Sequence, residues 1–245
     1  MTGAATAAPV RPGPWPRREF AARLHAYGTR YHHLHPFHRR MDAGELTRTE
    51  LQRWVANRFY YQRCIPLKDA AILARCPEVG VRRVWIRRIV DHDGTSDATG
   101  GTASWLALGE ALGVARADLV SERHVVPGVR YAVDAYVNFA RQKPWIEGVA
   151  SSLTELFGPA AIAARLAGLE RHYAWIDPAG LEYFRSRLVQ APRDAEHALD
   201  LVLEHCRTLE QQLAAVAALR FKTEVLWAQL DAIERGTTQP PAPDA

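Results

Sequence analysis

Side chains that bind anions and move protons recur at a spacing of four residues along this chain. Arg58 and Gln62 lie four apart in WVANRFYYQRCIPLKD, and Arg88 and His92 have the same spacing in WIRRIVDHD. Residues at positions i and i+4 are neighbours on one face of a helix, and here that face is otherwise apolar. A guanidinium group stays charged, so its burial requires an anion beside it. Either a protein carboxylate or a ligand must therefore meet Arg58 and Arg88.

Further polar residues fall on or beside apolar helix faces elsewhere in the chain. Lys222 lies within the apolar stripe of the last predicted helix, and Tyr183 and Arg187 form another pair four residues apart. Any one of these residues alone is more often structural, as one half of an ion pair or as a packed side chain. Together they are less readily explained as structural residues. Glu155 is the clearest inward acid, and one carboxylate cannot neutralise the three cations Arg58, Arg88 and Lys222. The pattern favours a small, multiply negative ligand, with His92 and Tyr183 as titratable groups beside it.

A metal site is the rival interpretation, because four histidines lie close together near the N-terminus. His32, His33, His35 and His38 are dense enough to suggest one, but Pro36 interrupts any regular spacing. A di-iron bundle would use two Glu-x-x-His motifs, and the sequence has none. No cysteine–histidine zinc pattern appears either. We therefore expect no metal.

Composition narrows the class of protein. Of 245 residues, Lys plus Arg number 31 and Asp plus Glu 27, a net charge of +4 that is too mild and too scattered to predict nucleic-acid binding. No apolar run reaches the roughly 18 residues of a membrane span. Cys64, Cys76 and Cys206 show no paired spacing, which is typical of a reducing compartment. The expected location is the cytoplasm, with no partner membrane or nucleic acid.

Helical periodicity predicts an all-α protein, a compact bundle of about seven helices. The expected organisation is one helical-bundle domain over residues 18–235, between a disordered leader at 1–17 and a disordered tail at 236–245. Pro66 is expected to interrupt the second helix, and another helix is expected to end before Pro192. From Asp194 to about Glu234, the pattern predicts one continuous helix.

Several long blocks of the sequence resemble the pyrroloquinoline quinone synthase (PqqC) family. These blocks are WVANRFYYQRCIPLKDAAILARCP, WIRRIVDHDG, SERHVVPGVRYAVDAYVNFAR, SSLTELF, YFRSRL and the final FK, and the resemblance covers roughly residues 20–235. It implies a haem-oxygenase-like bundle without haem that forms a homodimer. It also implies the last step of pyrroloquinoline quinone (PQQ) biosynthesis, in which a tricarboxylated amino-quinone undergoes ring closure and eight-electron oxidation. O2 is the co-substrate, H2O2 is released, and no metal or redox cofactor takes part.

The same resemblance implies a role for each polar residue of the site. His92 would be the main general base and would face the oxygen site, which Tyr183 and Arg187 complete. The resemblance leaves open a further protein partner, either a PQQ carrier protein or an enzyme that accepts the product. The residues expected to bind the polycarboxylate quinone are His32, Arg58, Gln62, Lys68, Arg88, Tyr136, Glu155, Arg165 and Lys222.

One position departs from the family pattern and keeps an alternative open. Ile162, in GPAAIAARL, stands where the family carries a histidine, so an aliphatic group replaces a titratable one beside the ring. The alternative function is a quinone-binding protein of the same fold with impaired or partial turnover. A thiaminase-like hydrolase is a third hypothesis, and it would need a cysteine nucleophile. Cys64 is available beside Pro66, but without an evident base.

Overall fold

The computed structural model describes residues 13–236, and within that range it contains helices and connections but no strand. The predicted all-α class is confirmed. Within the same range, no helix combines the length and the apolarity needed to cross a bilayer. The segments are α1 (Arg17–His25), η1 (Ala26–Arg30), η2 (His32–Leu34), α2 (Pro36–Asp42), α3 (Arg48–Arg75), α4 (Val79–Trp85), α5 (Arg87–Asp93), α6 (Gly100–Ala111), α7 (Arg116–Val120), α8 (Pro127–Gln142), α9 (Trp145–Ser151), η3 (Ser152–Phe157), α10 (Gly158–His172), η4 (Pro178–Leu181), α11 (Glu182–His205) and α12 (Leu209–Arg235).

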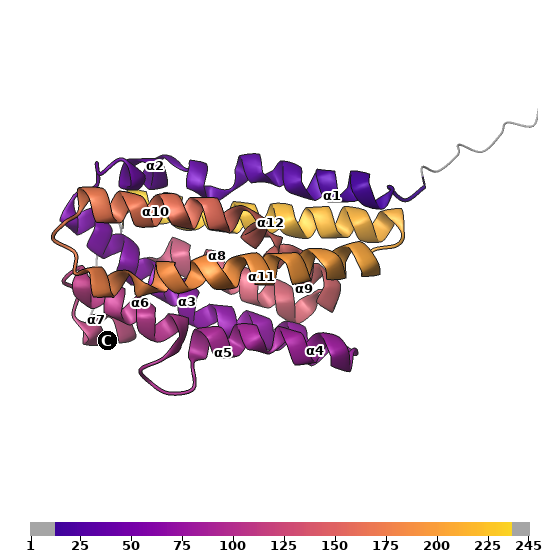
Figure 1. Ribbon diagram of the computed structural model, residues 1–245, viewed down its shortest axis with the longest axis horizontal. Helices are drawn as coiled ribbons and strands as arrows, with labels where there is room; N and C mark the ends of the chain where they lie inside the picture. The colour runs from indigo at the N-terminus through magenta and orange to yellow at the C-terminus, as the bar shows by residue number, and fades with distance from the viewer. Residues whose placement is uncertain (1–12, 237–245) are drawn as a thin grey trace, which may run out of the picture.

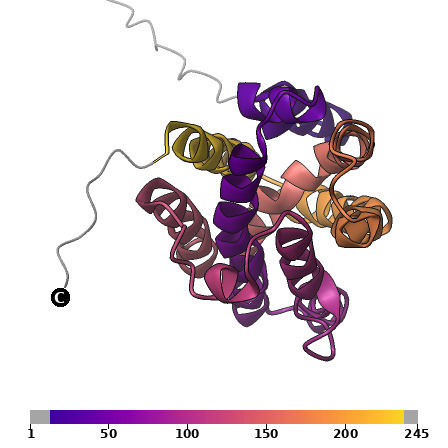
Figure 2. The same ribbon diagram turned by 90° about the vertical axis from the view of Figure 1, so that its left-hand side faces the viewer.

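Helices α10, α11 and α12 lie along one axis, and α3 passes obliquely through the middle of the bundle (Figure 1). Viewed along that axis, α3 runs through the middle, with α8 and α12 on one side and α10 and α11 on the other (Figure 2). It packs directly against α5, α6, α8 and α9, and α1 lies across α11 and α12. Because α3 is central, side chains on several of its faces are buried. The predicted leader and tail fall outside the described residues, apart from 13–17 and Gly236, and α1 already begins at Arg17.

The central helix starts at a capping box and does not stop at its proline. The Thr47 hydroxyl accepts a hydrogen bond from the Glu50 amide at 3.2 Å, and the Glu50 carboxylate accepts one from the Thr47 amide at 2.7 Å. The predicted interruption at Pro66 is wrong, since α3 continues through it to Arg75. Proline forfeits one backbone hydrogen bond, but here it is buried, and packing on both sides of it stabilises the helix. Lys68 therefore lies inside α3.

The two C-terminal helices also differ from the prediction. Helix α11 passes through Pro192 to His205, because Ala191 and Ala195 keep that face buried on either side of the proline. The predicted single helix from Asp194 to Glu234 is wrong, since the chain turns after His205. A second capping box begins α12, where the Thr208 hydroxyl accepts from the Gln211 amide at 3.2 Å. The Gln211 side chain accepts from the Thr208 amide in return.

Two apolar clusters share α3, which also carries buried polar residues. Leu51 and Trp54 belong to one cluster, together with Trp105 of α6. Ile72 belongs to the other, together with Trp85 of α4. Buried polar residues lie along the middle of α3, interspersed with Phe59 and Cys64 of the first cluster, so the bundle has a polar middle. They are Asn57, Arg58, Gln62, Lys68 and Asp69.

The second capping box provides a test of how α12 begins. Thr208→Ala removes the side-chain acceptor for the Gln211 amide, and we expect the free energy of unfolding to fall by about 1 kcal/mol. Urea denaturation followed by circular dichroism measures this loss. Thr208→Ser keeps a hydroxyl and should retain most of the stability. An equal loss in both variants would contradict a capping role.

Candidate functional site

The polar middle of the bundle lines a cavity of about 970 Å³, part of which is open to solvent. This volume suits a small organic ligand, and most helices contribute to its walls. Of the site residues predicted from the sequence, all except Arg88 and Lys222 line it. They are His32, Arg58, Gln62, Lys68, His92, Tyr136, Glu155, Arg165, Tyr183 and Arg187. The apolar residues of the wall include Trp54, Trp105, Ile162, Phe184 and Leu226.

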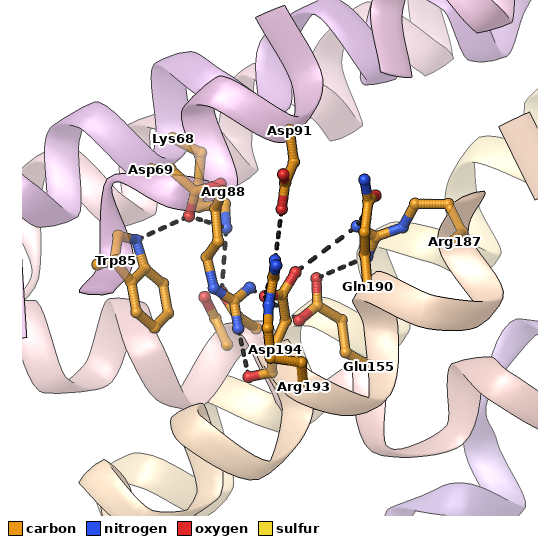
Figure 3. A network of polar contacts seen from close by, with 12 residues as sticks. Lys68, Asp69, Trp85, Arg88, Asp91, Glu155, Arg187, Gln190, Arg193 and Asp194 are labelled. Atoms are coloured by element: carbon orange, nitrogen blue, oxygen red, sulfur yellow. Dashed lines mark hydrogen bonds and ion pairs between the residues drawn. The ribbon is translucent and has the colours of Figure 1, made fainter. Parts of the chain in front are cut away.

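Arg88 lies behind the wall, in a network that joins α5, η3 and α11 (Figure 3). One of its guanidinium nitrogens donates to Glu155 at 2.7 Å, and another donates to the Asp194 carbonyl oxygen at 2.5 Å. Its guanidinium carbon lies 4.1 Å from the centre of the Trp85 ring. The other Glu155 oxygen lies 3.4 Å from Arg187. Glu155 thus bridges two arginines, so Arg88 has its anion within the protein.

The two arginines determine the charge state of Glu155. Burial acts to raise the pKa of this carboxyl group, but Arg88, Arg187 and Lys68 outweigh burial and lower the pKa below its ordinary value. Glu155 is therefore ionised. Arg187 has a second acid close by, with Asp194 Oδ2 at 3.6 Å.

Lys68 is paired with an acid that the sequence did not reveal. Its ammonium group donates to Asp69 Oδ1 at 2.6 Å and to the Ser152 hydroxyl at 3.1 Å. The Trp85 indole donates to the same Asp69 oxygen at 2.9 Å. Burial acts to lower the pKa of Lys68, yet the attraction of Asp69, Tyr136 and Glu155 raises it. Lys68 is thus a charged residue with its own counter-ion.

Arg165 has an internal partner as well. Its guanidinium group donates to both carboxylate oxygens of Asp42 in α2, one of them at 3.4 Å. Asp42 was not predicted, since nothing in its local sequence marks it as inward. Arg165 still contributes to the cavity wall.

Arg58 and Lys222 are the cations that lack a counter-ion. Among residues 13–236, no carboxylate oxygen lies within 4.0 Å of either group. Arg58 donates to the Gln229 side-chain oxygen at 2.8 Å and lies 4.1 Å from the Tyr61 ring centre. Lys222 donates to the Tyr61 hydroxyl at 2.8 Å, with its nitrogen 3.3 Å from the Tyr136 ring centre. The surplus of positive charge predicted from the sequence therefore resides at Arg58 and Lys222.

Uncompensated burial changes the acidity of Lys222. Its side chain is 1% exposed. Burial, followed by repulsion from Lys68 and Arg58, lowers the pKa of Lys222 well below its ordinary value. An anion bound in the cavity would reverse this shift. Tyr61, which contacts both unpaired cations, was not identified from the sequence, because its position one residue before Gln62 gives no sign of that contact.

His92 is a neutral base whose free nitrogen is buried. Its Nδ1 lies 3.1 Å from the Arg88 carbonyl oxygen, which can only accept, so Nδ1 carries the proton and Nε2 carries the lone pair. Nε2 has no hydrogen-bond partner among the described residues. Burial, reinforced by Arg187, lowers the pKa of His92 to about 4. Nearby, the Tyr183 hydroxyl donates to Gln62 at 3.0 Å, and burial raises the pKa of Tyr183, so it stays protonated.

The N-terminal histidines divide between structural and cavity positions. His35 accepts a hydrogen bond from the Phe37 amide at the start of α2. His32, His33 and His38 line the cavity, and His38 was not predicted there. Burial lowers the pKa of His32 and His38 well below the ordinary value. Within residues 13–236, no group of three or more His, Cys, Asp or Glu side chains is arranged to hold a metal ion.

Comparison with known proteins assigns the family. The model of the TENA/THI-4/PQQC family matches residues 21–232. The chain belongs to the TENA/THI-4/PQQC family. It is 55% identical over 225 residues to a protein of Cronobacter sakazakii named pyrroloquinoline-quinone synthase, covering 92% of this chain and 90% of that protein. A protein of the same name from Pseudomonas aeruginosa is 56% identical over 217 residues, covering 89% and 87%.

Solved structures of this family's fold confirm the expected architecture. A domain of unknown function with a haem-oxygenase-like fold, from Shewanella denitrificans, superimposes with a TM-score of 0.75. The match covers 90% of this chain and 93% of that one, at 12% identity. A TenA homologue from Pseudomonas syringae superimposes with a TM-score of 0.68 over 92% and 99%, at 11% identity. The bundle is therefore haem-oxygenase-like.

Ile162 and the cysteines bear on the two alternative functions. Ile162 is half-buried, lines the cavity and packs against the apolar cluster of Trp54 and Trp105. No cysteine lines the cavity described by residues 13–236. Burial raises the pKa of Cys64 to about 11, so its thiol stays protonated and is a poor nucleophile. The geometry does not favour a hydrolase.

The contrast between two neighbouring arginines tests the buried network. Arg88→Ala leaves Glu155 with one arginine fewer, and we expect the free energy of unfolding to fall by about 3–5 kcal/mol. Arg87 is exposed on the same helix, so Arg87→Ala should change stability by no more than about 0.5 kcal/mol. Urea denaturation of both variants measures the difference, and equal effects would contradict the network.

The depressed pKa of His92 predicts a loss of stability in mild acid. Its ordinary pKa is 6.5 and its folded pKa is about 4, so the unfolded chain takes up the proton first. The contribution of His92 is fully present above about pH 6.5 and declines as the pH falls towards 4. Between pH 7 and pH 5 this amounts to about 2 kcal/mol. His92→Asn should reduce the measured pH 7-to-5 difference in unfolding free energy by that amount.

The exposed His25 supplies the matched control for this measurement. Its side chain lies in water, so His25→Asn should leave the pH 7-to-5 difference unchanged. If His92→Asn behaves like His25→Asn, His92 does not stay neutral in the folded protein.

Proposed function

We propose that this chain is a pyrroloquinoline-quinone synthase. It catalyses ring closure and eight-electron oxidation of a tricarboxylated amino-quinone, with O2 as the oxidant and release of H2O2. The observation that carries this proposal is the uncompensated charge of Arg58 in the wall of the cavity, with Lys222 against the lining residues Tyr61 and Tyr136. Relatives at 55% and 56% identity that bear this enzyme's name support the same chemistry.

Substrate binding would use the two unpaired cations first. A carboxylate placed beside Arg58 and Lys222 supplies the anion that neither cation finds in residues 13–236, while Lys68 and Arg187 offer further donors in the wall. A guanidinium group can hold a carboxylate through two parallel hydrogen bonds, which orients the ligand as well as binding it. Tyr136, His32 and the wall tryptophans would cover the faces of the planar ring system.

Proton transfer would start at His92. Its Nε2 lone pair accepts a proton from the bound substrate, and Arg187 and Glu155 lie close enough to respond to the new charge. The deprotonated substrate is rich in electrons and passes them to O2. Tyr183 and Arg187 would donate hydrogen bonds to the reduced oxygen, which stabilises its negative charge. In this scheme the substrate is itself the electron donor, so we propose that the enzyme uses no metal and no redox cofactor.

The proposal extends to assembly and location. We propose a cytoplasmic homodimer, on the basis of the family resemblance and of three unpaired cysteines in the sequence. The exposed apolar side chains of Val84, Ile86 and Val90, which are 40%, 49% and 45% exposed, support a protein partner on α4 and α5. The small-molecule partner is the polycarboxylate quinone. A carrier or acceptor protein for the product remains a hypothesis.

Turnover by the metal-stripped protein tests the function. After treatment with a chelator, the purified protein should convert the amino-quinone to pyrroloquinoline quinone in air, with peroxide formed. Absorption spectra and a peroxide assay follow the reaction. Arg58→Ala should weaken substrate binding by about 10- to 100-fold because a charge-assisted contact is lost, whereas the exposed Arg87→Ala should not. No product after incubation with stoichiometric protein would refute the proposal.

The same assay distinguishes the binding-protein alternative. Wild-type protein that binds the quinone tightly but stops at a partly oxidised species would favour that alternative. Restoration of full turnover by Ile162→His would then assign the deficiency to Ile162.

A further inference from the structure

Gln229 contacts the unpaired Arg58, and the proposed mechanism does not use it. Its side chain is 0% exposed and is not one of the described residues that line the cavity. The side-chain oxygen accepts a hydrogen bond from Arg58 Nη1 at 2.8 Å. The amide nitrogen of Gln229 has no hydrogen-bond partner among the described residues. Within the same residues, the polar contact that this side chain makes is therefore the one with Arg58.

Helix α12 brings an amide, and no acid, to the side of Arg58. Lys222, Leu226 and Gln229 follow one another at i, i+4 and i+7, which places them on one face of α12. All three are at most 2% exposed, and α12 packs against α3. The nearest acids along the helix, Glu224 and Asp231, have side chains that are 60% and 48% exposed. The inward face of α12 thus supplies Arg58 with a neutral oxygen.

A neutral oxygen orients a guanidinium group without cancelling its charge. Arg88 shows the other arrangement, with a Glu155 oxygen 2.7 Å from its guanidinium group. Arg58 meets the Gln229 oxygen and the face of the Tyr61 ring instead, and burial lowers the pKa of Arg58 below its ordinary value. Glutamate has the same length as glutamine and could accept the same hydrogen bond. The difference between the two side chains at position 229 is therefore the charge.

The remaining nitrogens of Arg58 are available to a ligand. Arg58 lines the cavity and is 8% exposed. Within residues 13–236, Nη1 is the nitrogen that finds an acceptor, and Nε and Nη2 are not among the polar atoms that are sealed off without a partner. A carboxylate that enters the cavity can therefore meet Arg58 while Gln229 keeps its own contact.

We propose that Gln229 is a positioning residue that holds Arg58 and, by being neutral, reserves the charge of Arg58 for a carboxylate of the ligand. This inference rests on the proposed function, which supplies the class of ligand, a polycarboxylate quinone. An acid at position 229 would form an internal ion pair with Arg58 and compete with the ligand. The amide thus determines whether this part of the cavity selects for negative charge.

Gln229→Glu tests the importance of neutrality, because it adds a charge and keeps the accepting oxygen. We expect the affinity for pyrroloquinoline quinone, measured by equilibrium binding under nitrogen gas, to fall by about tenfold or more. The urea midpoint should not fall, since the new acid faces a buried cation. Gln142→Glu is the matched control, because Gln142 is exposed on α8. It adds the same charge in water, and its affinity should stay within about twofold of wild type.

Gln229→Met separates the charge from the hydrogen bond. It removes the accepting oxygen but leaves Arg58 unpaired, so we expect a smaller loss of affinity than in Gln229→Glu. Wild-type affinity in Gln229→Glu, or an equal loss in both variants, would overturn the proposal. Loss of affinity accompanied by a lower urea midpoint in both variants would also overturn it, since Gln229 would then be needed only for folding.

The salt dependence of binding gives a readout that a role in folding would not change. Neutralising Arg58 removes one charged contact with the ligand, so the affinity of Gln229→Glu should fall less steeply with added salt than that of wild type. An unchanged slope would contradict the proposal. Turnover in air tests the proposed function separately. Wild-type protein that binds pyrroloquinoline quinone but forms no product would refute the synthase function alone, whereas wild-type protein that does not bind it would refute both.

Discussion

The burial of positive charge is the constraint on which this structure depends. A bundle core tolerates an arginine or a lysine only where an anion or an oriented oxygen meets it. Glu155 satisfies two arginines at once, at 2.7 Å from Arg88 and 3.4 Å from Arg187, and in doing so ties α5, η3 and α11 together. Asp69 pairs with Lys68 and also accepts a hydrogen bond from the Trp85 indole, which links α3 to α4 (Figure 3). These contacts position the helices that form the cavity.

Two of the buried cations have no carboxylate partner among the described residues. Arg58 and Lys222 meet a glutamine oxygen and two tyrosines, which lower the cost of burial without cancelling the charge. The cavity consequently has an unpaired cation at Arg58 and an acid-paired region at Glu155 and Arg187. Such a division suits a ligand that is asymmetric in charge, because each end is favoured in one place only.

The helical class, the facing of several site residues and the family could already be predicted from the amino-acid sequence. The 3.6-residue period predicted the all-α class, and the same period placed Arg58 and Gln62 on the buried face of α3. Arg88 and Arg87 were distinguished correctly for the same reason, one buried and the other exposed. The long blocks of family resemblance led to the family that the comparisons then confirmed. These inferences succeeded because helical facing and family membership depend on local sequence.

The continuation of helices through proline and the choice of ion-pair partners were decided by the tertiary structure, because both depend on which helices meet. Helix α3 continues through Pro66 since neighbours bury the helix on both sides, and no local signal predicts that packing. The pairing of Arg165 with Asp42, 123 positions away along the chain, cannot be read from either segment. The sequence alone determined that more cations than acids face inward. Only the packing of the helices decided that Arg88 has its anion within the protein, while Arg58 is left to meet a ligand.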